Sequence, residues 1–354
     1  MKVIARFVCR LLLCLLIVGA PAALAGNVVF ITVDGVRFQE FFGGVQKSAR
    51  AGLPRGTRLF PALEADADRG GTWVFGDGER TGMFRVADFS AVSLPGYRAM
   101  LSGEFEDRCW GNGCRNIDRE TIFDGLAHRG FARGSVAAFT SWDGLGRALE
   151  SSPGGIVRDV AHGTYPTEGA SAEELVAAAD IAAQDRSNLP PWGGRRDTYT
   201  YAAAKLYLEH HHPRFLYLSL GDTDEFAHLK QYRSYVDSLR RYDAWIVELR
   251  NLLLTMGDYG ADTSIVLTTD HGRGAGAFWS FHNSLFSSAF RTWAAVIPSA
   301  RLRMNGQIRP RVSRAYDQRD IRPTLETLLG VESDVTPLRT GQSLVLNKAH
   351  ENSL

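Results

Sequence analysis

Four ionisable side chains follow an apolar run in the segment RFLYLSLGDTDEFAH, residues 214–228. If a helix begins after this run, Asp222 fits its N-cap and Glu225 lies three residues later, the spacing of a capping box. Asp224 and His228 are four residues apart and share a helical face, on which a carboxylate and an imidazole can grip one cation such as zinc. This register favours Asp224 and His228 as metal ligands and leaves open whether Asp222 also binds metal.

Two further β-forming runs end in an aspartate. Asp270 and His271 follow TSIVLTT, and a strand that ends in Asp-His brings two metal-ligating groups to the edge of a sheet, although the same pair also suits a turn. Asp34 lies between NVVFITV and Gly35, which is a common turn position as well. His282, in FWSFHN, is either a further ligand or a core histidine beside aromatic residues. Each signal is weak alone, and the combination predicts a metal site.

A nucleophile is expected in the segment DFSAVSLPGYRAMLSG, residues 88–103. Ser93 precedes Leu94-Pro95-Gly96 and a helical pattern. A hydroxyl at a helix N-terminus faces free backbone N–H groups and the positive end of the helix dipole, which suits an anionic substrate. The alternative is that Ser93 is only the N-cap of that helix.

The elements that must position these residues alternate between short β-rich runs and helical patterns, which predicts an α/β fold with a mostly parallel central sheet, helices on both faces and a single catalytic domain. In such sheets the active crevice lies at the carboxyl ends of the strands, where three of the runs end in acidic residues. Near the C-terminus, DIRPTLETLLG predicts a helix with Asp320 as N-cap, Pro323 in its first turn and Gly330 at its end. The β-rich runs are 27–33, 134–139, 214–220, 263–269 and 291–298.

The first 25 residues read as a signal peptide. Lys2, Arg6 and Arg10 precede the apolar LLLCLLIVGAPAALA, which ends in the small-x-small pattern of a cleavage site. An uncleaved anchor is the alternative, although the apolar run is shorter than the ~18 residues that span a bilayer. We expect cleavage after Ala25 and an exported mature chain, residues 26–354, periplasmic or secreted, with no membrane span.

The composition excludes several classes of protein. The 354 residues are 45% apolar and 22% charged, values of an ordinary globular protein. The formal net charge of +1, which cleavage would change to −2, gives no reason to expect a surface that binds nucleic acid or an anionic membrane. The two cysteines of the mature chain, Cys109 and Cys114 in RCWGNGCR, predict a disulfide around a tight loop. The alternative of a two-cysteine metal site lacks a nearby histidine.

Taken in chain order, these motifs resemble the alkaline phosphatase superfamily, on the branch of type I phosphodiesterases and nucleotide pyrophosphatases, with sulfatases and cofactor-independent phosphoglycerate mutases as relatives. The resemblance covers about residues 27–330 and implies two divalent metal ions, usually zinc in exported members and sometimes manganese in cytoplasmic ones. It implies one ion held by Asp34, Asp270 and His271 with the Ser93 oxygen, and a second held by Asp224, His228 and His282. The motifs are Asp34, Ser93-x-Pro, Asp224-x-x-x-His228, Asp270-His271-Gly272, His282 and Asp320-x-x-Pro323-Thr.

The resemblance further implies that Ser93 attacks a small-molecule phosphate ester and that water then hydrolyses a phosphoseryl intermediate. Arg98 and Arg273 are candidates for neutralising the non-bridging oxygens. Tyr97 stands where sulfatases carry an arginine, which argues against a sulfatase, and the large inserted domain of the mutases has no counterpart. Monoester and diester preference stay open. The alternatives are a phosphoryl or phosphoethanolamine transferase that uses the same Ser93, and a silent binding protein on the same fold.

Overall fold

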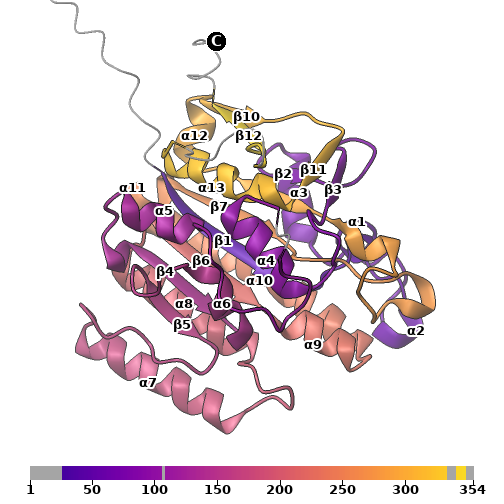
Figure 1. The fold of residues 1–354 in the computed structure, drawn as a ribbon, viewed down its shortest axis with the longest axis horizontal. Helices are drawn as coiled ribbons and strands as arrows, with labels where there is room; N and C mark the ends of the chain where they lie inside the picture. The colour runs from indigo at the N-terminus through magenta and orange to yellow at the C-terminus, as the bar shows by residue number, and fades with distance from the viewer. Residues whose placement is uncertain (1–25, 106–107, 333–339, 348–354) are drawn as a thin grey trace, which may run out of the picture.

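The computed structural model describes residues 26–105, 108–332 and 340–347 (Figure 1). The predicted signal peptide, residues 1–25, lies outside the described residues. The described chain is built around a seven-stranded sheet in the order β2-β9-β7-β1-β6-β4-β5. All its strands run parallel except β9, which is antiparallel to both of its neighbours. The strands are β1 (Asn27–Val33), β2 (Trp73–Phe75), β4 (Val136–Thr140), β5 (Val157–Val160), β6 (Phe215–Leu220), β7 (Thr263–Thr268) and β9 (Ala294–Ile297).

The run 291–298 differs from the single strand expected there. It is divided at Trp293 into β8 (Arg291–Thr292) and β9. Trp293 is buried, stacks on Phe41 with ring centroids 3.6 Å apart, and donates its indole N–H to the carbonyl oxygen of Val36 at 3.2 Å. Packing of this one side chain thus accounts for the break. β8 joins a small sheet with β3 (Met83–Arg85) and β11 (Ala315–Asp317), and β10 (Ile308–Pro310) pairs with β12 (Val345–Asn347).

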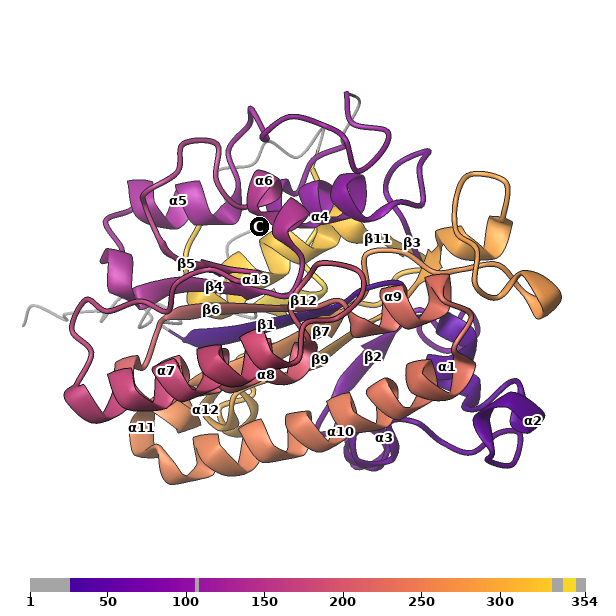
Figure 2. The ribbon, with the colours of Figure 1, turned by 90° about the horizontal axis from the view of Figure 1, so that it is seen from below.

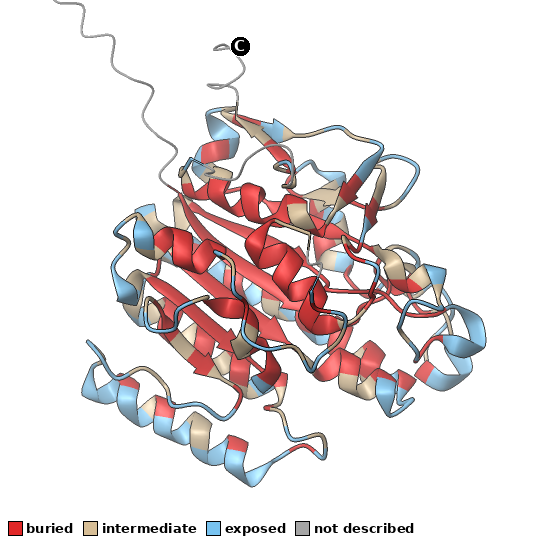
Figure 3. Ribbon diagram, viewed as in Figure 1, coloured by how far each residue is buried: buried red, intermediate tan, exposed pale blue. Residues whose placement is uncertain are grey.

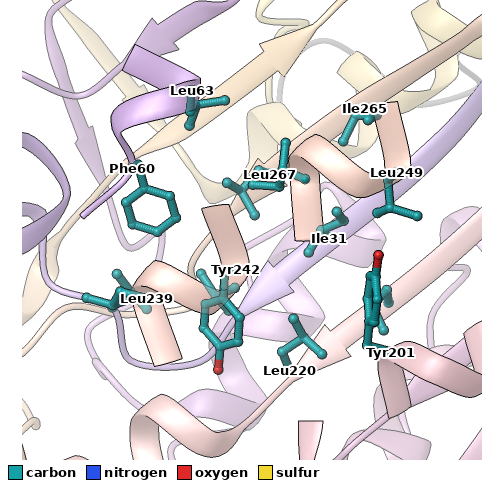
Figure 4. Packing of buried hydrophobic residues seen from close by; sticks show 14 of the residues in the cluster. Ile31, Phe60, Leu63, Tyr201, Leu220, Leu239, Tyr242, Leu249, Ile265 and Leu267 are labelled. Carbon is teal, nitrogen blue, oxygen red and sulfur yellow. The ribbon is translucent and has the colours of Figure 1, made fainter. Parts of the chain in front are cut away.

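Helices cover both faces of the central sheet, as Figure 2 shows with the sheet nearly edge-on. On one face lie α8 (Asp197–His211) and α10 (Tyr232–Thr255), and Figure 4 shows their aromatic and aliphatic side chains packed on β1, β6 and β7. On the other face lie α4 (Ser93–Ser102), α5 (Ile122–His128) and α13 (Ile321–Leu329). Along β1, Val29 and Ile31 point to the first face while Val28 and Phe30 point to the second, as alternation in a strand requires.

The remaining helices lie around this frame. α7 (Ala172–Ser187) is the most exposed of the long helices in Figure 3, whereas α4, α13 and the central strands are largely buried. No helix among the described residues is both long and apolar enough to cross a membrane. The other α-helices are α1 (Phe38–Gly43), α2 (Ser48–Ala51), α3 (Pro61–Asp68), α6 (Gly146–Leu149), α9 (Asp222–His228), α11 (Gly257–Ala261) and α12 (Ala300–Met304).

The order of the central strands confirms the sequence argument about strand ends. β7, β1 and β6 are neighbours and parallel, and Val33 is aligned with Leu220 at the ends of β1 and β6. The residues that follow these three strands therefore emerge at one edge of one sheet. The C-terminal helix is also as expected, with Asp320 at the N-cap position and Gly330 in the left-handed conformation at its end.

A disulfide joins Cys109 to Cys114, as the sequence predicts. The loop that it closes reaches the N-terminus of α4, where the Asn112 side chain accepts a hydrogen bond from the Leu94 N–H at 3.0 Å. The disulfide loop therefore supports the helix that begins at Ser93.

Gly96 allows α4 to approach the end of β7. A Cβ atom at this position would lie 2.7 Å from the carbonyl oxygen of Asp270 and 3.0 Å from the amide nitrogen of Gln318. We predict that Gly96→Ala lowers the free energy of unfolding by about 1–3 kcal/mol through overpacking, despite the better helix propensity of alanine. Urea denaturation measures this loss. Gly113→Ala is the matched control, because no atom lies within 4 Å of its Cβ position. Equal stability of both variants would contradict the close approach.

Candidate active site

Two groups of three potential ligands lie side by side at the carboxyl edge of the sheet. Within each group the ligand atoms are within 4.8 Å of one another. The structure thus brings together the six aspartate and histidine side chains that the sequence predicts as metal ligands, in the expected groups of three. The first group is Asp34, Asp270 and His271, and the second is Asp224, His228 and His282.

The first group is buried and rich in negative charge. Asp34 follows β1 and Asp270 follows β7, and both side chains are almost inaccessible to solvent. Burial, together with the negative charge of Asp270, raises the pKa of Asp34 to about 8, and burial raises the pKa of Asp270 to about 6. The Asp270 Oδ1 atom accepts the Gly35 N–H at 2.9 Å, whereas Oδ2 accepts no hydrogen bond from the described residues. An unpaired buried carboxylate oxygen beside a second carboxylate is an arrangement that a cation would stabilise.

His271 presents one ring nitrogen to this group. Its Nδ1 donates to the carbonyl oxygen of Gly272 at 2.9 Å, so Nε2 is left 3.6 Å from Asp34 Oδ1 and 3.4 Å from Asp270 Oδ2. Burial lowers the pKa of His271, which favours the neutral imidazole. A neutral ring oriented by a backbone carbonyl is the usual form of a metal-ligating histidine.

The second group lies on α9 and on the loop that follows β7. His228 Nε2 is 2.9 Å from Asp224 Oδ2 and 3.1 Å from His282 Nε2. The His282 Nδ1 atom bonds to the carbonyl oxygen of Ala91 at 2.8 Å, so this ring too is oriented by the backbone. Burial lowers the pKa of His282, which favours a neutral ring. The group is more open than the first, because His228 is exposed to solvent.

The two groups are in direct contact with each other. The rings of His271 and His282 are stacked with centroids 4.0 Å apart, and His271 Nε2 lies 3.7 Å from Asp224 Oδ1. Gly35 has a positive φ of 63°, and a Cβ there would lie 2.5 Å from the Asp224 carboxylate. Glycine at this turn therefore lets the β1 and α9 segments meet.

Ser93 lies beside the first group, close to where the two groups meet. Its hydroxyl oxygen is 3.4 Å from Asp34 Oδ1 and 3.3 Å from His271 Nε2. Ser93 is the first residue of α4, and Val92 takes the N-cap position without a side-chain hydrogen bond. The alternative reading of Ser93 as an ordinary N-cap is therefore wrong.

The capping box expected at the start of α9 is also wrong. The helix begins at Asp222 with Gly221 at the N-cap position, and no side chain of α9 caps it. The N–H groups of Gly221 and Asp222 instead donate to the Asp197 carboxylate at 2.7 and 2.9 Å. Asp197 opens α8 and also accepts hydrogen bonds from Ser141 and Tyr242. A cap supplied by another helix leaves no local sequence signal.

Asp222 lies apart from both ligand groups. Its Oδ1 atom accepts no hydrogen bond from the described residues, and the nearest cation, Arg241, is 3.9 Å from Oδ2. Burial and the negative charge of Asp197 raise the pKa of Asp222 to about 8. The structure therefore places Asp224, and not Asp222, with the other potential ligands.

The two arginines predicted to contact substrate are engaged with protein oxygens. Arg273 is fully buried and donates to Gly35 O at 3.2 Å and to Ser280 O at 2.7 Å, and it also contacts the Asp224 carboxylate. This geometry gives Arg273 a role in positioning Asp224. Arg98, buried in α4, donates to the carbonyl oxygen of Arg115.

Three residues that support the site were missed by the sequence analysis. Tyr97 donates its hydroxyl to Asp34 Oδ2 at 3.0 Å, and its position four residues after Ser93 on one helical face was a usable signal. Thr223 donates to the Asp34 carbonyl oxygen at 2.7 Å, and the Gln318 side chain donates to the Asp270 carbonyl oxygen. The latter two contacts join distant segments and leave no pattern in the sequence.

A cavity of about 350 Å³ lies away from these groups, between β2, α1, α3 and the β10–β11 region. Aromatic residues such as Phe41, Trp73 and Tyr316 line it together with charged residues. None of the ligand groups contributes to this cavity, so the cavity is not part of the candidate active site.

Neither a protein-family model nor a curated protein matches the sequence. Several solved structures match the fold of the described chain. A phosphonate monoester hydrolase from Silicibacter pomeroyi matches with a TM-score of 0.53 and 15% identity, over 90% of this chain and 76% of the hydrolase. The lipoteichoic acid synthase LtaP from Listeria monocytogenes matches with a TM-score of 0.54 and 12% identity, over 91% of this chain and 75% of the synthase.

A third solved structure, a protein in the alkaline phosphatase superfamily from Vibrio parahaemolyticus, matches with a TM-score of 0.50 and 15% identity, over 87% of this chain and 67% of that one. The described chain therefore has the alkaline phosphatase-like fold that the sequence motifs predict. The solved structures that share this fold include a hydrolase and a synthase.

The start of α9 leads to a prediction that distinguishes the contributions of Asp197 and Asp222 to stability. Asp197→Asn should lower the free energy of unfolding by about 2 kcal/mol, because the amide replaces a charged acceptor of two backbone N–H groups. Asp222→Asn should leave stability unchanged or raise it, because the substitution removes a like charge from beside Asp197. Urea denaturation at pH 8 compares the two variants. An equal loss in both would show that Asp222 also holds the helix start.

Proposed function

We propose that the chain is a metal-dependent hydrolase of phosphoric esters in which Ser93 is the nucleophile. The observation that carries this proposal is the position of the Ser93 hydroxyl, which lies within 3.4 Å of both Asp34 and His271 at the N-terminus of α4. A hydroxyl between a carboxylate and an imidazole can lose its proton, and the positive end of a helix favours a phosphoryl anion.

The ligand groups fit two divalent cations. Asp34, Asp270 and His271 would hold one, with Ser93 oxygen beside it, and Asp224, His228 and His282 would hold the other. Oxygen and imidazole donors suit zinc and also manganese, and export favours zinc in the family that the motifs resemble. When bound, two such cations supply Lewis acidity that favours the ionised hydroxyl and stabilises the leaving oxygen.

The protein's own groups hold the nucleophile in place. Tyr97 donates to one oxygen of Asp34, which leaves the other oxygen facing the Ser93 hydroxyl. The Ser93 hydroxyl loses its proton, and its oxygen forms a bond to phosphorus as the bond from phosphorus to the alcohol oxygen breaks; that oxygen takes up a proton and the alcohol leaves. Water then attacks the phosphorus of the phosphoserine, which releases phosphate and restores the Ser93 hydroxyl. Because His228 is exposed, the second group is where water and the leaving alcohol can enter and depart.

A transferase is the second candidate, since an alcohol could replace water in the last step. The fold likeness to the synthase LtaP favours keeping this alternative. In both cases we propose an exported enzyme with residues 1–25 as its signal peptide, residues 26–354 as the catalytic domain and a small-molecule phosphate ester as substrate. The disulfide between Cys109 and Cys114 supports an oxidising compartment.

The test uses 4-nitrophenyl phosphate, bis(4-nitrophenyl) phosphate and 4-nitrophenyl sulfate, each with zinc, manganese or a chelator. We expect metal-dependent turnover of a phosphate ester. Ser93→Ala should lower kcat at least about 1,000-fold while metal content, measured by elemental analysis, stays nearly intact. Ser187→Ala, on the exposed helix α7, is the control and should be fully active. Full activity of Ser93→Ala would refute the nucleophile, and product formed only with an added alcohol would favour the transferase.

A further inference from the structure

The loop that carries His282 has an unusual surface. Residues 275–290, AGAFWSFHNSLFSSAF, contain no charged residue among sixteen. Most of this segment is exposed, with Phe278 at 56% and Leu285 at 86% of their full accessible surface. Phe278, Phe281 and Phe286 pack against one another, with ring centroids 5.5–6.4 Å apart. A surface loop of this composition exposes apolar area that folding alone does not require.

A second apolar surface lies on the segments around Ser93. Phe89 and Trp110 are 67% and 63% exposed, and their rings are stacked with centroids 6.4 Å apart. Trp110 belongs to the disulfide loop, whose backbone is tied to the nucleophile segment by the hydrogen bond from Ser90 Oγ to the Trp110 carbonyl oxygen at 2.8 Å. The disulfide loop therefore holds an exposed indole close to the start of α4.

The two surfaces meet at the mouth of the site. Ser284 Oγ donates to the carbonyl oxygen of Phe89 at 2.8 Å, and His282 bonds to the carbonyl oxygen of Ala91. We call Phe89, Trp110, Phe278, Phe281 and Leu285 the apolar rim. It includes all four aromatic residues that rank as exposed large hydrophobics in the described chain. The exposed aromatic residues of the described chain are therefore gathered on the segments that carry Ser93 and His282.

We propose that the apolar rim rests on a lipid surface, so that the site acts on phosphoric esters whose alcohol or acyl part is embedded in lipid. This inference rests on the proposed function for the identity of the reacting group. Exposed Trp, Phe and Leu side chains are the groups that enter the boundary between head groups and acyl chains. The Lys230 ammonium lies 5.7 Å from the centroid of the Phe281 ring, where it can meet a lipid phosphate.

The position of the rim favours lipid over a protein partner. Because both halves of the rim border the ligand groups, a protein bound there would cover the route to Ser93. A lipid surface in the same place would itself supply the ester. The absence of charge in residues 275–290 further predicts that attachment is apolar and depends little on salt.

The first test measures co-flotation of the mature protein with phosphatidylcholine vesicles at low and high salt. We expect the wild type to bind at both, and the double variant Phe278→Ser/Leu285→Ser to bind at least about 10-fold more weakly, because two exposed apolar side chains no longer enter the lipid. Leu254→Ser is the matched control, since Leu254 is 81% exposed on α10 outside the rim, and it should bind like the wild type. Absence of vesicle binding by the wild type would overturn the proposal, as would equal weakening by the control.

A second measurement separates this inference from the proposed function. Turnover of water-soluble bis(4-nitrophenyl) phosphate should be the same in the wild type and the double variant, because neither substituted residue is among the ligand groups. An equal loss of soluble turnover and vesicle binding would overturn the lipid role. Gel filtration tests a different occupant of the rim. A dimer that the wild type forms and the double variant does not form would identify the rim as a contact between copies and would overturn the lipid role. Vesicle binding needs no turnover, so it tests the lipid role whatever the outcome of the Ser93 experiment is.

Discussion

The candidate site is governed by one electrostatic constraint, the crowding of buried carboxylates at the ends of neighbouring strands. Asp34 and Asp270 emerge from β1 and β7, which are hydrogen-bonded to each other, and both are removed from water. Burial and the negative charge of Asp270 raise the pKa of Asp34 to about 8, and one oxygen of Asp270 accepts no hydrogen bond from the described residues. Such an arrangement is costly unless positive charge is supplied. Burial lowers the pKa values of His271 and His282, which disfavours charged rings, and the guanidinium of Arg273 is engaged with Asp224. A pair of divalent cations would meet this requirement, and the hydroxyl of Ser93, the proposed nucleophile, lies beside Asp34.

Other features of the fold serve to keep these groups close. Gly35 and Gly96 permit two approaches that a Cβ atom would block, one toward Asp224 and the other toward the end of β7. Asp197 anchors the first turn of α9, and Arg273 holds the Asp224 carboxylate from the buried side. The disulfide loop supports α4 through Asn112 and carries Trp110 of the apolar rim. The same segments thus position the potential metal ligands and carry the apolar rim.

Much of this could be predicted from the sequence. The fold class, the strands that end in Asp34 and Asp270 and the helical spacing of Asp224 and His228 follow from periodicity, because local patterns and strand order determine them. The cap of α9 could not be predicted, since it comes from Asp197 on another helix. The roles of Arg273 and Gln318 depend on long-range packing, and burial of Trp293 divides a strand that reads as continuous. Sequence patterns report which face a residue takes within its own element, and not which side chain from a distant segment meets it.

The most direct measurement is an anomalous difference map from crystals of the mature protein grown with zinc and recorded at the zinc edge. The account predicts two peaks, one among Asp34, Asp270 and His271 and the other among Asp224, His228 and His282. A single peak, or peaks that avoid these six side chains, would contradict the two-metal site and with it the proposed chemistry of Ser93.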